Sequence, residues 1–76
     1  MIPEKADLIL EIGDLLSYNK FTHDIVVNKD IFDNFSKNTL IYIHFVEDED
    51  RCIREYMMES EDADGITMSY LCEYID

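Results

Sequence analysis

The apolar residues of the first segment recur at spacings of four, three and one positions, which fits one face of a helix. Pro3 suits a first helical turn, where the missing N–H is not needed. We therefore predict a helix over 3–18, with Gly13 as a mild interruption. The residues of its apolar stripe are Leu8, Ile9, Ile12, Leu15 and Leu16.

The middle of the chain predicts two strands around a short helix. Residues 21–27 contain β-branched side chains and indicate a short strand. Asn28 is typical of a helix N-cap, so we predict a helix over 29–36 that buries Ile31, Phe32 and Phe35. The nearly continuous apolar run LIYIHFV predicts a strand over 40–46 that is buried on both faces.

After this run, four acidic residues precede apolar pairs that are one helical turn apart. Acids suit a first helical turn, so we predict a helix over 48–60. The alternative is a strand over 51–58, joined to the preceding strand by an acidic turn. Residues 61–65 predict a loop, and the alternation over 66–75 favours a closing strand.

These elements predict an α+β fold. A chain of 76 residues has material for one core, so we expect a single small acidic domain over 1–76. It would contain two or three short helices packed on a small sheet of two or three strands.

Charge is distributed unevenly along the chain. The net charge is −12, and eleven acidic residues between Glu47 and Asp76 face only Arg51 and Arg54 in that half. Such a field attracts cationic surfaces and repels nucleic acid and anionic membranes. Hydrophobic residues make up 47% of the chain, too many for a disordered acidic tail. No signal peptide or membrane span is evident, so we expect a cytoplasmic protein.

On the predicted helix over 48–60, Asp48, Glu55, Glu59 and Asp62 would share one stripe. Their axial steps of about 10, 6 and 4.5 Å are of the order of the separations between phosphates on a nucleic acid. The alternative is a solvated helix face with no binding role.

Tyrosines in the acidic half add contact area to this charge. Tyr70 and Tyr74 are expected to be neighbours on one face of the last element. The predicted partner-binding residues are Glu47, Asp48, Glu49, Asp50, Glu55, Glu59, Glu61, Asp62, Asp64, Tyr70 and Tyr74.

No motif for a metal, a cofactor or catalysis is present. The SEDADG segment fails as a calcium loop, because Leu71 stands where the twelfth position requires Glu. His23, His44, Cys52 and Cys72 lack the spacing of a zinc site or a catalytic pair. Both cysteines are expected to be reduced thiols, and we predict neither metal, cofactor nor enzymatic activity.

The leading hypothesis is a non-enzymatic acidic inhibitor that binds a basic, nucleic-acid-binding protein by mimicking nucleic-acid phosphates. Ten Ile against two Ala indicate an AT-rich coding sequence, which points towards a phage, a mobile element or a low-GC bacterium. In size and charge the chain resembles the small acidic inhibitors that phages encode against restriction or CRISPR effectors. The alternative is an acidic interaction module or adaptor that regulates a cellular protein without mimicry. Such an adaptor would be homodimeric if apolar residues of 3–18 or of the final strand joined two copies.

Overall fold

The fold is a single curled sheet rather than helices on a small sheet. The computed structural model describes residues 5–32, 34–49 and 51–75. Within these ranges the helical segments are two 3-10 turns, so the predicted α+β class is wrong. The elements are β1 (Leu8–Leu10), η1 (Ile12–Asp14), β2 (Ser17–Tyr18), β3 (Ile25–Asn28), η2 (Lys29–Ile31), β4 (Leu40–Phe45), β5 (Cys52–Glu61) and β6 (Gly65–Ile75).

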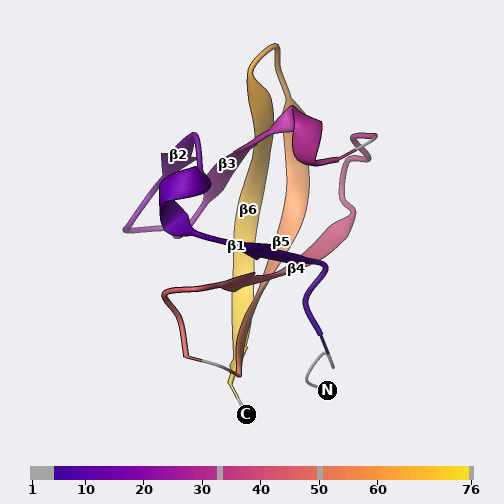
Figure 1. Cartoon of the computed structure of the whole chain (residues 1–76). Helices are drawn as coiled ribbons and strands as arrows, with labels where there is room; N and C mark the ends of the chain where they lie inside the picture. Colours follow the sequence, from indigo (N-terminus) through magenta and orange to yellow (C-terminus); the bar gives the residue numbers. More distant parts are fainter. Residues whose placement is uncertain (1–4, 33, 50, 76) are drawn as a thin grey trace.

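The strands are ordered β1-β4-β5-β6-β3-β2. β1 runs parallel to β4, and the other neighbours are antiparallel. Figure 1 shows β5 and β6 as a long upright hairpin, with β1 and β4 running across it and β3 beside β6. The sheet curls into a half-barrel, which gives it an inner face and an outer face.

Two bulges interrupt the β5–β6 ladder. Glu55 pairs with Cys72 whereas Tyr56 pairs with Tyr70, so Leu71 has no partner on β5. Near the tip, Glu59 is the unmatched residue on β5. Bulges bend a strand and increase its twist, which favours the curl of this sheet.

The inner face carries the core. Apolar side chains at alternate positions of β3 to β6 point into the half-barrel, as the period of two requires. Partly buried side chains of the N-terminal segment and the η2 region pack over them, Leu8, Leu10 and Phe32 among them. The buried core consists of Ile25, Val27, Ile41, Ile43, Phe45, Tyr56, Met58, Ile66 and Met68.

The predicted helix over 3–18 is wrong. β1, η1 and β2 occupy the described part of this segment, and β1 is held by pairing Leu8 with Ile43 and Leu10 with Phe45. Leu8 and Leu10 face the core, while Ile9 between them is 70% exposed. A long-range partner strand therefore overrides the helical spacing of the apolar residues.

The helix over 29–36 shrinks to one turn. Asn28 does cap it, because its Oδ1 accepts the Asp30 N–H at 3.0 Å. Phe32 then adopts an extended backbone and ends the turn. Ile31, Phe32 and Phe35 nevertheless pack against the core, although each is only partly buried.

The predicted helix over 48–60 is also wrong, and its strand alternative is correct in kind. β5 occupies Cys52–Glu61, and β4 and β6 confirm the strands predicted over 40–46 and 66–75. β4 is buried on its inner face only, since Leu40 is 44% exposed and Tyr42 and His44 are half-buried. The strand predicted over 21–27 is displaced to Ile25–Asn28.

Candidate protein-binding surface

The predicted acidic site is divided between the two ends of β5. Glu47, Asp48 and Glu49 lie in the β4–β5 loop, while Asp62 and Asp64 lie at the β5–β6 tip, next to Glu61. Figure 1 shows the tip at the top of the hairpin and the loop at the bottom. Ten strand residues at about 3.3 Å each separate them by roughly 30 Å. Asp50 lies outside the described residues.

Some of these acids have partners inside the fold. Both carboxylate oxygens of Glu47 accept the Ile12 N–H at 3.2 Å. Asp62 accepts the N–H groups of Asp64 and Gly65 at 2.9 and 3.0 Å, and these bonds lower the pKa of its carboxyl. The carboxylates of Glu47 and Asp62 therefore stabilise loops of the fold.

Asp48 is the most strongly engaged acid. Its carboxylate receives Arg54 Nε at 2.8 Å and Nη2 at 2.9 Å, a two-bond ion pair. The guanidinium also lies 5.1 Å from the centroid of the Phe45 ring and donates to the Tyr18 hydroxyl at 3.4 Å. Asp48 is thus tied to the core and does not form a stripe with Glu55, Glu59 and Asp62.

Tyr70 and Tyr74 lie on opposite faces, contrary to the prediction. Tyr70 packs on the core side, 5.7 Å from the Tyr56 ring and 5.2 Å from the His23 ring between centroids. Partial burial raises its pKa. The reason is the unmatched Leu71, because one extra residue reverses the facing of every residue that follows it.

Tyr74 instead joins a row of side chains on the outer face. Tyr42 is opposite Glu55, and Glu55 is opposite Cys72, so the three lie side by side across β4, β5 and β6. The Tyr74 hydroxyl donates to Glu55 Oε1 at 2.9 Å. We call Tyr42, Glu55, Cys72 and Tyr74 the outer-face cluster.

The cluster has a negative electrostatic environment. Partial burial, followed by the charges of Glu55 and Asp7, raises the pKa of Tyr42. Hydrogen bonding to Cys72 and Glu55 raises the pKa of Tyr74. The charges of Glu55 and Asp7 disfavour a further negative charge and would stabilise a cation at the same position, whereas burial disfavours a charge of either sign.

Apolar side chains adjoin the cluster. Leu40 and Met57 form the next cross-strand pair on the same face, and Leu40 is 44% exposed. Ile9 on β1 stands beside His44 and is 70% exposed. The outer face is therefore partly open to solvent, with the four residues of the cluster half-buried, and it combines aromatic, apolar and acidic groups.

The thiols and imidazoles show no arrangement for catalysis or metal binding. Burial, reinforced by Asp48 and Glu73, raises the pKa of Cys52 to about 11, so this thiol is a poor nucleophile. His23 Nδ1 lies 2.8 Å from the Tyr18 hydroxyl, and His44 Nδ1 lies 2.8 Å from the Cys52 carbonyl oxygen. Among the residues that the structure describes, no three His, Cys, Asp or Glu side chains are grouped to hold a metal ion.

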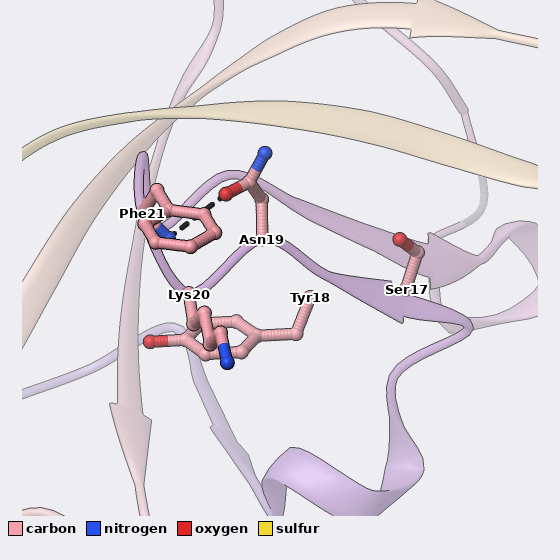
Figure 2. Close-up of a pocket in the computed structure, with 5 residues that line it drawn as sticks. All are labelled: Ser17, Tyr18, Asn19, Lys20 and Phe21. Atoms are coloured by element: carbon pink, nitrogen blue, oxygen red, sulfur yellow. Dashed lines mark hydrogen bonds between the residues drawn. The ribbon is translucent and has the colours of Figure 1, made fainter.

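A second exposed feature, which sequence reasoning missed, is the loop after β2. Asn19 Oδ1 accepts the N–H groups of Phe21 and Thr22 at 2.8 and 3.1 Å, which fixes the loop. Phe21 is 85% exposed beside a hollow of about 470 Å³ lined by residues 17–21 (Figure 2). Lys20 Nζ lies 5.6 Å from the Phe21 ring centroid. Its positive charge makes this loop a poorer site for a basic partner than the outer face.

Comparison with protein-family models, curated proteins and solved structures found no match to this chain. The described segments include no helix with the length and apolar character needed to cross a membrane.

Proposed function

We propose that this chain is a non-enzymatic interaction module that binds a basic surface of another protein through the outer face of β4, β5 and β6. The observation that supports this proposal is the outer-face cluster, where Glu55 lies among the tyrosines Tyr42 and Tyr74 on a partly open sheet face. Tyrosines supply contact area at interfaces, and the carboxylate selects for positive charge.

The rest of the charge acts at longer range. A net charge of −12 attracts a basic partner, and the acidic ends of β5 extend that field beyond the cluster. Screening limits such forces to about 8 Å at physiological salt. The field therefore accelerates association, and the outer-face contacts set the lifetime of the complex.

Mimicry of nucleic-acid phosphates is less well supported than this module. The mimicry hypothesis used a helical stripe of acids, whereas Asp48 is paired with Arg54 and Asp62 supports the β5–β6 tip. Mimicry now rests on net charge. It differs from the proposed module in requiring that nucleic acid compete for the same partner.

Affinity capture tests the proposal. The immobilised chain is incubated with nuclease-treated lysate of the source organism, in parallel with a variant carrying Tyr42→Thr and Tyr74→Thr. We expect basic proteins that bind the wild type, elute as salt rises and bind the variant poorly. The proposal fails if no protein shows this dependence on both salt and the two rings.

Nucleic acid then separates the two hypotheses. An excess of duplex DNA is added to the captured complex. Displacement of the partner would favour mimicry, and retention favours the interaction module.

A further inference from the structure

The two tyrosines of the outer-face cluster flank Glu55 without stacking on each other. The centroids of Tyr42 and Tyr74 are 6.5 Å apart and the ring planes are tilted by 57°. Glu55 Oε1 lies 2.9 Å from the Tyr74 hydroxyl, and Glu55 is the cross-strand neighbour of Tyr42. Neither ring covers the face of the other, which leaves aromatic surface beside a carboxylate.

Glu55 is bound by neutral donors. The Tyr74 hydroxyl donates at 2.9 Å, and the Cys72 thiol makes a weak contact at 3.9 Å. Partial burial and hydrogen bonding with Glu55 both raise the pKa of Tyr42, so the Tyr42 hydroxyl is a third neutral donor. An ionised carboxylate has about four lone-pair sites, so three such donors still leave acceptor capacity. Asp7 adds a second carboxylate nearby, where its Oδ2 accepts the Tyr42 N–H at 2.9 Å.

We propose that Tyr42, Glu55 and Tyr74 bind the guanidinium group of an arginine side chain on the basic partner, an inference that rests on the proposed function. A guanidinium is planar, donates hydrogen bonds to carboxylates and stacks on tyrosine rings. The neighbouring pair Leu40 and Met57 supplies apolar surface for the aliphatic stem of the arginine. The cluster matches each part of this side chain.

The test uses N-acetylarginine amide as the probe and its neutral analogue N-acetylcitrulline amide as the control. Amide signals of the ¹⁵N-labelled chain are followed by NMR during titration. We expect the arginine probe to shift the signals of Tyr42, Glu55 and Tyr74 with an affinity of order millimolar. The citrulline probe should bind about fivefold more weakly or worse, because it lacks the charge.

Variants assign the contacts. Glu55→Gln should weaken arginine binding about three- to tenfold, whereas Glu61→Gln, which removes the same charge at the hairpin tip, should leave it unchanged. Tyr74→Phe keeps the ring and should stay within about threefold of wild type, while Tyr74→Leu should lose more. Equal binding of citrulline, shifts centred on the acidic loops, or equal losses in Glu55→Gln and Glu61→Gln would overturn the inference.

This experiment does not depend on the partner. If the arginine probe fails while basic proteins are still captured through the two rings, the arginine site is wrong and the interaction module stands. If the probe binds while capture fails, the proposed function is wrong and the arginine site stands.

Discussion

Replacing Asp48 with Asn should destabilise the fold strongly, although Asp48 lies in a loop. Its carboxylate holds Arg54 at 2.8 and 2.9 Å, and the side chains of Arg54 and Asp48 are only 11% and 17% exposed. A neutral amide would leave the guanidinium confined against Phe45 without its counter-charge. The sequence-based view of Asp48 as a surface contact predicts no such effect.

The size of the effect follows from the burial of the pair. Removing one partner of a buried ion pair costs about 3–5 kcal/mol. Both side chains retain some solvent access, so we expect a loss of about 2–4 kcal/mol. At about 0.05–0.15 kcal/mol per residue, a chain of 76 residues has roughly 4–11 kcal/mol of stability in total. The variant should therefore lose a large fraction of it.

Urea unfolding followed by circular dichroism measures this loss. The set comprises wild type, Asp48→Asn, Arg54→Met, the double variant, and Glu49→Gln as a control at a neighbouring exposed acid. The double variant should be more stable than Asp48→Asn alone, because Met leaves no unpaired charge in the confined site. A loss of less than about 0.5 kcal/mol in Asp48→Asn, as for an ordinary surface change, would refute the reasoning.

Further predictions concern a tyrosine, the glycines and the thiols. Burial raises the pKa of Tyr56 to about 12, so the folded state holds its proton more tightly than the unfolded chain. Tyr56 should therefore account for roughly 2–3 kcal/mol of the fall in wild-type stability as pH rises from about 10 to 12, and the other tyrosines with raised pKa values add to that fall. Urea unfolding of Tyr56→Phe should show a fall that is smaller by this amount, and an equal fall would be evidence against this cause. Gly65→Ala should cost about 1–3 kcal/mol in thermal melts, because its Cβ would lie 2.5 Å from a β3 carbonyl oxygen. Gly13→Ala, with nothing within 4 Å, should stay within about 1 kcal/mol of wild type, and equal losses at both glycines would contradict the packing argument. Iodoacetamide at about pH 8 should modify half-buried Cys72 before buried Cys52, because burial raises the pKa of the Cys52 thiol to about 11. Peptide mapping that found the reverse order would contradict this prediction.

The sequence predicts β4 and β6 correctly because each strand has a simple local pattern of apolar residues. β4 is an apolar run bounded by polar residues, and β6 alternates over most of its length. The sequence predicts a helix in place of β5 because the acids before it suit a first helical turn. The apolar pairs Cys52–Ile53 and Tyr56–Met57, one helical turn apart, fit a helix as well. Two bulges interrupt the pairing of β5 with β6, at Glu59 on β5 and at Leu71 on β6. They arise from the pairing between the strands, so the sequence of either strand alone does not predict them.

The candidate site was predicted in part. Glu55 and Tyr74 were among the predicted contact residues, but their contact arises from pairing between β5 and β6. Tyr42 was missed, although its position between buried Ile41 and Ile43 places it on the opposite face of the strand. Reading LIYIHFV as alternating rather than continuous would have identified it.

The central claim is that partner contacts centre on the outer-face cluster. The most direct test compares the affinity of a captured basic partner for two double variants of the folded chain. Tyr42→Thr with Tyr74→Thr removes both rings and no formal charge, whereas Glu61→Gln with Asp64→Asn removes two charges at the hairpin tip. We predict a loss of about tenfold or more for the first and less than about threefold for the second, at about 0.15 M salt. A larger loss for the tip variant would contradict the account, because net charge would then outweigh the outer face.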